Sequence, residues 1–427
     1  MSIVIVGMLD EREPALQLIK EQIERRGHRA TLIDISIGTG GITPSLKAQV
    51  TSEEVAEAGG TTLDKIKETL IKEREKATSM VAEGLAKKVL ELYRAGELKG
   101  IIAVGGMTGS FISLTAMKPL PFGIPKLLIS SAAAMPAYAR RLAEYFGTRD
   151  ITVMHSVVDT VGLNPIVRSL MVNGVGAICG MVEEFKPRAK EEKPSIALTE
   201  FGFCDTGAHY VRELLEQKNY NVISFHATGM GDSAAEDLVN QGLFEAFIDL
   251  VPAGLSEYLL GGNRAARPDR LEAACNQGIP YILAPCGFDM ISCGPLERRD
   301  KDDPLWVSRK LAERKLLIQD ALRVQARTSA EEVRIIAQAV AEKLAKHKDK
   351  KLARFLVPLR GFSSLSVEGG ALHDPAVDQV FIDELKRNLD PDIKVVEVDT
   401  HINTRAFAEA VVEALEESSK LQTRAKE

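Results

Sequence analysis

The stretch GIIAVGGMTGS, residues 100–110, combines the residue types that an anion-binding loop needs. Four apolar residues, typical of a buried strand, lead into glycines and hydroxyl side chains, namely Gly105, Gly106, Thr108, Gly109 and Ser110. Glycines let a ligand approach the backbone, and free N–H groups at the start of a following helix attract negative charge. We therefore predict a phosphate-binding loop here, with tight packing of a strand against a helix as the alternative.

A second stretch of this kind, HATGMGD, occupies residues 226–232. It also follows a predicted strand and precedes a predicted helix, so Thr228 and Gly229 are candidate contacts to an anion or a ribose. His226 could donate a hydrogen bond to a phosphate or act as a general acid–base group. A hydrogen-bonded structural histidine at the end of a strand is an equally good interpretation.

Two further loops contain groups that could take part in proton transfer. The stretch PCGFDMISCG carries Asp289, which could orient a metal or a ribose. A long polar loop carries His373 and Asp374, and Asp374 fits the N-cap of a helix that begins at Pro375. Asp289, His373 and His226 are therefore the candidate catalytic residues of an enzyme acting on a small anionic metabolite.

Several classes of protein are disfavoured by what the sequence lacks. The motifs G-x-x-x-x-G-K-[ST], G-x-G-x-x-G and G-x-S-x-G are missing, and no spacing of histidines or cysteines predicts a metal site. A formal charge of −6 argues against a nucleic-acid surface. No apolar run approaches the roughly 18 residues of a membrane span. The five cysteines include no C-x-x-C pair, and with no signal-like start we expect a cytoplasmic protein.

Apolar runs alternate with helical patterns along the whole chain. Strands are predicted at 3–6, 30–35, 101–104, 126–129, 151–154, 196–199, 222–225, 246–251, 281–283, 355–357 and 395–398. The main helices are predicted at 63–95, 165–182, 329–346, 375–388 and 404–417. Such alternation predicts an α/β protein with parallel sheets covered by helices on both faces.

The chain divides at a charged segment with two prolines, residues 183–195. We predict two Rossmann-like, doubly wound domains, 1–183 and 195–427, facing a cleft. The second half begins like the first, with a strand, a polar loop containing an aspartate, a helix and a strand. Ligands of such sheets bind at the carboxyl ends of the strands, where the loops described above lie.

The order of these loops resembles the family of the N-terminal ATP-binding domain of the tomato mosaic virus resistance protein, which has many uncharacterised bacterial and archaeal members. The matching pieces run through nearly all of the chain: IVIVGMLD, RRGHRATLIDI, GIIAVGGMTGS, GIPKLLIS, YFGTRDITVMHSVVDTVGLN, SFHATGMGD, GLFEAFIDL, PDRLEAACNQGIP, PLRGFSSL, GGALHDP and VDTHIN. The resemblance implies two Rossmann-like domains, binding of ATP with or without Mg²⁺, and self-association as a homodimer.

Transferred residue by residue, the resemblance adds further candidates to the glycine-rich loop, namely Leu9, Asp10, Ser130 and Ser131. Many relatives have Asp-Thr-Lys-Gly where this chain has the four residues that begin at Asp10, Asp-Glu-Arg-Glu. Carboxylates in place of a lysine are expected to weaken triphosphate binding by like-charge repulsion. A smaller or less charged ligand is therefore an alternative to ATP.

The sequence is compatible with three functions. The first is a protein that binds a nucleotide or another phosphorylated ligand, with no reaction assigned. The second is an enzyme that acts on a small anionic metabolite between the two domains. The third is an interaction scaffold, in which the glycines only pack strands against helices.

Overall fold

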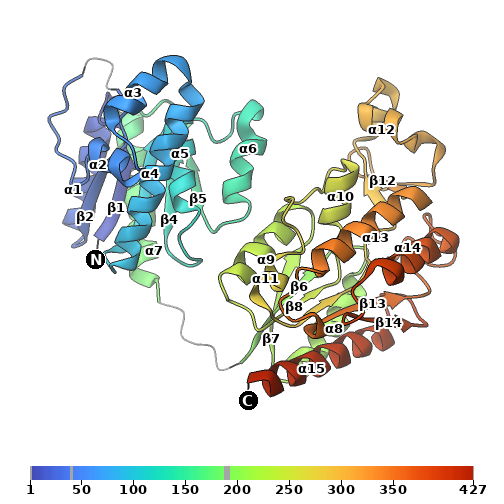
Figure 1. The fold of residues 1–427 in the computed structure, drawn as a ribbon. Coiled ribbons are helices and arrows are strands. Elements are labelled where there is room, and N and C mark those ends of the chain that lie inside the picture. The colour runs from blue at the N-terminus through green and yellow to red at the C-terminus, as the bar shows by residue number, and fades with distance from the viewer. Residues whose placement is uncertain (1, 39–41, 187–192, 427) are drawn as a thin grey trace. The chain divides into compact units, whose positions relative to one another are not determined.

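The computed structural model describes residues 2–38, 42–186 and 193–426. It consists of two compact units, Met1–Ala189 and Lys190–Glu427, each with its own sheet (Figure 1). The six residues 187–192 of the predicted linker lie outside the described residues.

The N-terminal unit is built on a five-stranded parallel sheet with the order β2-β1-β3-β4-β5. Its strands are β1 (Ser2–Gly7), β2 (Arg29–Asp34), β3 (Leu98–Gly105), β4 (Lys126–Ser130) and β5 (Thr152–His155). Alternate residues of β1 point to opposite faces, with Ile3 and Ile5 in one apolar cluster and Val4 and Val6 in another. The strands therefore form apolar runs in the sequence because both faces of the sheet are covered.

Helices cover the two faces of this sheet unequally (Figure 1). One face carries α1 (Glu13–Arg25) and α7 (Pro165–Glu184). The other carries α2 (Ser52–Ala58), α3 (Leu63–Lys72), α4 (Arg74–Arg94), α5 (Met107–Met117) and α6 (Pro136–Phe146). The predicted helix 63–95 is wrong in one respect, because the chain leaves the helical conformation at Glu73 (φ −139°, ψ 72°). This break separates α3 from α4.

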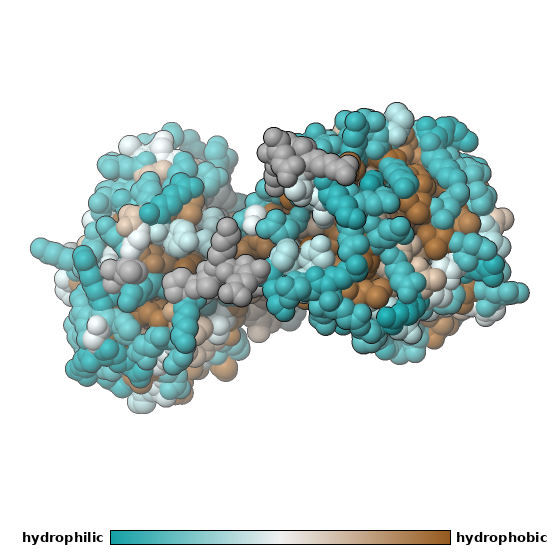
Figure 2. Space-filling view, turned by 90° about the horizontal axis from the view of Figure 1, so that it is seen from below, coloured by the Kyte–Doolittle hydropathy of each residue, from teal (hydrophilic) through white to brown (hydrophobic). Residues whose placement is uncertain are grey.

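Helix α7 is long and apolar enough to cross a membrane, judged by length and composition alone. The expectation that no stretch approaches a membrane span is therefore wrong by that measure. In the structure α7 packs against α1, β3 and β4. The approach is close, since a Cβ on Gly174 would lie 2.5 Å from Cδ1 of Ile129. The helix thus buries one side against the sheet, and Figure 2 shows a mainly hydrophilic surface with interspersed apolar residues.

The C-terminal unit contains a six-stranded parallel sheet with the order β14-β13-β9-β8-β6-β7. Its strands are β6 (Ser195–Glu200), β7 (Asn221–His226), β8 (Ala246–Asp249), β9 (Tyr281–Leu283), β13 (Ala353–Pro358) and β14 (Lys394–Val398). A small antiparallel sheet, which the sequence did not predict, is made of β10 (Met290–Ser292), β11 (Leu316–Ile318) and β12 (Val324–Arg327).

Helices also cover both faces of the larger sheet. One face carries α8 (Asp205–Gln217) and α15 (Arg405–Lys426), which pack on each other. The other carries α9 (Met230–Asn240), α11 (Ala273–Gln277), α13 (Ala330–Leu344) and α14 (Pro375–Asn388). The short helices α10 (Gly254–Leu260) and α12 (Pro304–Ser308) lie beside the small sheet. The C-terminal helix thus belongs to the second unit.

The two large sheets share one strand order when their strands are numbered within each unit, 2-1-3-4-5, with a sixth strand added in the second. The prediction of two doubly wound α/β units is therefore confirmed. In this order the crossover direction reverses between β1 and β3, and between β6 and β8. Ligands of open α/β sheets bind at such a switch point, outside the carboxyl ends of the strands.

Candidate functional site

A cavity of about 510 Å³ opens at the switch point of the N-terminal sheet. Its walls come from the loops after β1, β2 and β3 and from α3, α4 and α5. The lining residues are Met8, Asp10, Arg12, Ile37, Gly38, Leu70, Arg74, Thr78, Val104, Gly105, Gly106, Met107, Thr108 and Gly109. The cavity therefore includes most of the glycine-rich loop that the sequence singled out.

The glycine-rich loop forms the start of α5. Gly106 is the N-cap, and no side chain caps the helix. The first-turn N–H groups, on Met107 to Gly109, have no carbonyl within their own helix to bind, and these residues line the cavity. A helix start of this kind carries partial positive charge and favours an anion.

The two consecutive glycines of the loop have different structural roles. A Cβ on Gly105 would lie 2.9 Å from Cα of Gly109, so this glycine permits β3 to pack closely against α5. A Cβ on Gly106 would meet nothing nearer than Oγ of Ser131 at 3.7 Å and Nη2 of Arg12 at 3.8 Å. Packing therefore explains Gly105, whereas Gly106 leaves the backbone open towards the cavity.

Arg12 places a guanidinium group in the cavity wall. Its Nη1 binds Oδ2 of Asp10 at 2.5 Å, and its Nη2 lies 3.6 Å from Oδ1 of Asp159. Its Nε is buried and has no hydrogen-bond partner among the described residues. The carboxylate of Asp10 also accepts a hydrogen bond from the backbone N–H of Arg12, at 2.9 Å. The Asp10–Arg12 pair thus fixes the loop after β1 with its cation beside Gly106.

Glu13 does not add negative charge to this cavity. Its carboxylate accepts hydrogen bonds from the backbone N–H groups of Ser45 at 3.0 Å and Leu46 at 2.8 Å. The hydrogen bond from the Ser45 hydroxyl, more than any other contact, holds the pKa of Glu13 below its usual value. Glu13 and Glu11 line a neighbouring depression instead. These two carboxylates therefore do not line the cavity itself.

Arg74 and Thr78 also line the cavity, and the sequence analysis missed both. Arg74 is the first residue of α4 and is exposed, and no described carboxylate forms an ion pair with it. It reaches this position because the chain breaks at Glu73, one residue earlier. No glycine or proline marks that break, so the sequence contained no clear signal for it.

Four other predicted contacts support the loop from behind or beside it. Ser110 and Ser130 are fully buried and share a hydrogen bond of 2.7 Å between their hydroxyl groups. The buried Leu9 donates its backbone N–H to Oγ of Ser36 at 2.8 Å. Ser131 lies beside Gly106. These residues are not part of the cavity wall, and they position the residues that are.

The second glycine-containing stretch belongs to the C-terminal unit and lies at the end of β7, the outer strand of its sheet. His226 is exposed and Thr228 is half-buried. Gly229 has a φ of 92°, and a Cβ on it would lie 2.8 Å from the carbonyl oxygen of Ala265. A Cβ on Gly231 would lie 2.0 Å from the carbonyl oxygen of His226. These two glycines are required by close backbone packing.

The remaining catalytic candidates lie in different surroundings. Asp289 is fully buried and accepts hydrogen bonds from the hydroxyl of Ser363 and the backbone N–H of Gly287. His373 is half-buried, and its carbonyl oxygen accepts a hydrogen bond from Nζ of Lys315. Asp374 caps α14, as predicted, by accepting from a backbone N–H of the first turn. No hydrogen bond joins His226, His373 and Asp289 to one another.

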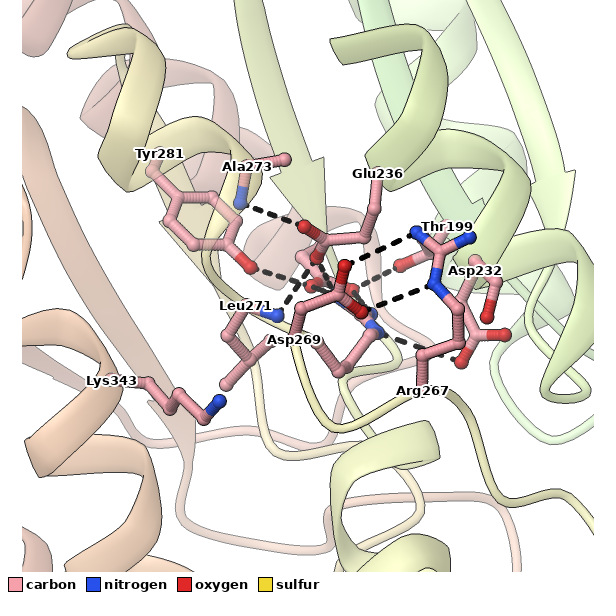
Figure 3. Close-up of polar contacts among 12 residues, drawn as sticks. Thr199, Asp232, Glu236, Arg267, Asp269, Leu271, Ala273, Tyr281 and Lys343 are labelled. Carbon is pink, nitrogen blue, oxygen red and sulfur yellow. Dashed lines mark hydrogen bonds and ion pairs between the residues drawn. The ribbon is translucent and has the colours of Figure 1, made fainter. Parts of the chain in front are cut away.

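A cluster of charged side chains is buried near the switch point of the C-terminal sheet (Figure 3). Arg270 donates to Oε1 of Glu236 and to Oδ1 of Asp249, both at 2.7 Å. Asp249, at the end of β8, also accepts from the hydroxyl groups of Thr199 and Tyr281. These side chains are at most 2% exposed. They tie the ends of β6 and β8 to the helices behind them.

Asp232 has the least favourable surroundings in this cluster. Neither of its carboxylate oxygens has a hydrogen-bond partner, although Nε of Arg270 lies 3.5 Å away. Burial raises the pKa of Asp232, and Arg270 opposes that effect. Burial raises the pKa of Glu236 as well. The Arg270 guanidinium is therefore the partner of three buried carboxyl groups, those of Asp232, Glu236 and Asp249. One positive charge cannot balance three negative ones, so this arrangement favours a proton on one of the carboxyl groups.

Neither metal binding nor thiol chemistry is supported by the described residues. No group of three or more His, Cys, Asp or Glu side chains is placed to hold a metal ion in residues 2–38, 42–186 and 193–426. The five cysteines are free and buried. Burial raises the pKa of both Cys275 and Cys293 to about 12. The cysteines are thus core residues.

Two family models together match almost the whole chain. The N-terminal domain of the uncharacterised protein family UPF0261 matches residues 1–187, and the C-terminal domain of the same family matches residues 193–419. The chain belongs to the UPF0261 family.

The relatives of this UPF0261 protein include bacterial and plant proteins. It is 33% identical to a UPF0261 protein of Clostridium tetani over 97% of this chain and 98% of that protein. It is 30% identical to the ToMV resistance protein Tm-1(GCR237) of Solanum lycopersicum, over 75% of this chain and 42% of the tomato protein. The predicted relation to the tomato resistance protein is therefore confirmed.

Solved structures show only a distant likeness to this UPF0261 protein. A Listeria monocytogenes protein described as a UDP-N-acetylglucosamine 2-epimerase matches with 10% identity and a TM-score of 0.22. The match covers 66% of this chain and 79% of that one.

Proposed function

We propose that the N-terminal unit binds the phosphate groups of ATP or a related nucleotide in the cavity between the carboxyl ends of β1 and β3. The supporting observation is that one cavity is lined by the uncapped start of α5 and by two guanidinium groups, those of Arg12 and Arg74. Helix N-termini and arginines both favour phosphate oxygens. A volume of about 510 Å³ suits a small-molecule ligand.

The cavity wall is equipped for binding, and we assign no reaction to it. Its described lining residues include no histidine, cysteine or lysine, and its one carboxylate, that of Asp10, is paired with Arg12. A Mg²⁺ ion would therefore arrive with the phosphate groups, because the described residues contain no ready-made metal site. The resemblance to the family of an ATP-binding domain points to the same class of ligand.

Ligand-dependent thermal stability tests the proposal. The full chain is heated with ATP, ADP, AMP and sugar phosphates, and a ligand that binds only the folded state raises the unfolding temperature. We expect the largest rise with ATP, since it offers the most phosphate charge. No rise with any of these compounds would overturn the proposal.

Two matched variants locate the binding site. Arg74→Gln removes an exposed cation of the cavity wall, and Arg94→Gln removes an exposed arginine at the other end of the same helix. We expect Arg74→Gln to weaken ATP binding about fivefold, as one partly screened ion pair allows. We expect Arg94→Gln to bind ATP as the wild type does. Equal effects of the two changes would indicate binding elsewhere.

A further inference from the structure

The cavity between β1 and β3 lies next to a second, smaller hollow of about 120 Å³. Three residues, Thr78, Met107 and Thr108, belong to the walls of both. The other residues that line the smaller hollow are Glu75, Phe111, Arg141 and Leu142. The two spaces are therefore neighbours, within the reach of one ligand of nucleotide size.

The smaller hollow differs from the larger one in its chemistry. Met107, Phe111 and Leu142 give it apolar surface, whereas Arg12 and Arg74 line only the larger cavity. Phe111 is half-buried, and its ring is held edge-on by that of Tyr145, with 5.9 Å between the ring centres. A firmly held aromatic face beside an anion site is suited to a planar ring attached to the anion.

An exposed ion pair forms part of the wall of the smaller hollow. Arg141 binds Oε1 of Glu75 at 2.9 Å, and its guanidinium lies 5.1 Å from the centre of the Phe111 ring. The Arg141 side chain is 55% exposed and that of Glu75 is 77% exposed. Exposed pairs of this kind contribute little to stability, so Arg141 is free to move when a ring enters.

We propose that the smaller hollow binds the planar aromatic ring of the ligand whose phosphate groups occupy the larger cavity, with Phe111 as the stacking residue. This inference rests on the phosphate-binding function proposed above. The volume admits a single ring system, and Met107, Phe111 and Leu142 offer that ring an apolar wall. The ligand class is therefore an aromatic phosphate ester such as a nucleotide, in preference to a sugar phosphate or an inorganic polyphosphate.

Calorimetric titration of the full chain tests the inference with ligand pairs that differ by the ring. ATP is compared with inorganic tripolyphosphate, and AMP with ribose 5-phosphate. Stacking of one base allows about a tenfold gain in affinity. We therefore expect the wild type to bind ATP at least tenfold more tightly than tripolyphosphate, and AMP more tightly than ribose 5-phosphate.

Variants at Phe111 add a second readout. Phe111→Leu keeps apolar volume but removes the aromatic face, and Phe122→Leu is the matched control, because Phe122 is exposed in the same unit and lines neither hollow. We expect Phe111→Leu to weaken ATP binding about tenfold and to leave tripolyphosphate binding unchanged. Phe122→Leu should bind both as the wild type does.

The outcomes separate this inference from the function on which it rests. If the wild type binds ATP and tripolyphosphate equally, the ring site is refuted while the phosphate site stands. If Phe111→Leu weakens both ligands to the same extent, Phe111 does not stack on a ring, and the inference fails. If no phosphorylated compound binds, the proposed function itself is wrong. The comparison of ligands on the wild type needs no variant to fold.

Discussion

Asp378 is expected to make the C-terminal unit less stable as the pH rises. This residue of α14 is 8% exposed, and its Oδ1 lies 2.5 Å from Nη2 of Arg327. Burial raises the pKa of Asp378 to about 7, and the charges of Asp289 and Asp374 add to this effect while Arg327 opposes it.

The sign and size of the effect follow from proton linkage. In the unfolded chain the carboxyl group has a pKa near its ordinary value of 3.8. Between that pH and about 7, the folded protein holds a proton that the unfolded chain has lost. The contribution to stability is complete below the lower pKa and is lost as the pH rises through the higher one. A pKa difference of this size corresponds to about 4 kcal/mol of unfolding free energy.

The single tryptophan of the chain provides the assay. Trp306 is buried in the C-terminal unit, so its fluorescence reports the unfolding of that unit in urea. The wild type and Asp378→Asn are compared across the range from about pH 4.5 to 8, in which the linkage acts. We expect the wild type to lose about 3 kcal/mol relative to the variant over this range, because the part of the linkage below pH 4.5 lies outside it.

A control and a refuting result complete this test. Asp383→Asn changes an exposed aspartate of the same helix, and we expect its pH dependence to match that of the wild type. Asp378→Asn also alters the hydrogen bond that Arg327 donates to this side chain, which shifts the stability of the variant at every pH, so the readout is the slope. Parallel slopes for the wild type and Asp378→Asn would refute the account of this buried carboxyl group.

Three further predictions concern residues of the buried charged cluster and of the glycine-rich loop. Arg270→Met should destabilise the C-terminal unit by at least about 3 kcal/mol, because it leaves buried carboxylates without their cation, and the same fluorescence assay measures this. Gly105→Ala should lower the unfolding temperature of the N-terminal unit, whereas Gly109→Ala, whose Cβ would meet nothing nearer than 3.7 Å, should preserve or raise it. Ser110→Ala should cost about 1 kcal/mol, measured by thermal unfolding, because the buried hydroxyl of Ser130 keeps only the hydrogen bond from the backbone N–H of Ala132.

The strands of both parallel sheets could be predicted because burial on both faces leaves a continuous apolar run in the sequence. The small antiparallel sheet could not, because its strands have three or four residues, as in Leu316–Ile318, and show no alternation of their own. The glycines of α7 differ in their surroundings. Gly174 packs closely on the sheet, whereas a Cβ on Gly180 would meet no atom within 4 Å.

The candidate site was predictable as far as the backbone determines it. A glycine-rich run after a buried strand marks the start of a helix, and that start lines the cavity. The cations depend on tertiary structure. Arg12 looked like a departure from the family pattern until its pairing with Asp10 placed it beside Gly106. Arg74 depends on a helix break that no sequence signal marks.

A crystal structure of the full chain grown with a non-hydrolysable ATP analogue tests the central claim most directly. We predict phosphate oxygens within hydrogen-bond distance of the backbone N–H groups of residues 107–109, with Arg12 and Arg74 turned towards them. An analogue bound at another place, or a cavity closed by the protein's own side chains while the analogue is present, would contradict the claim.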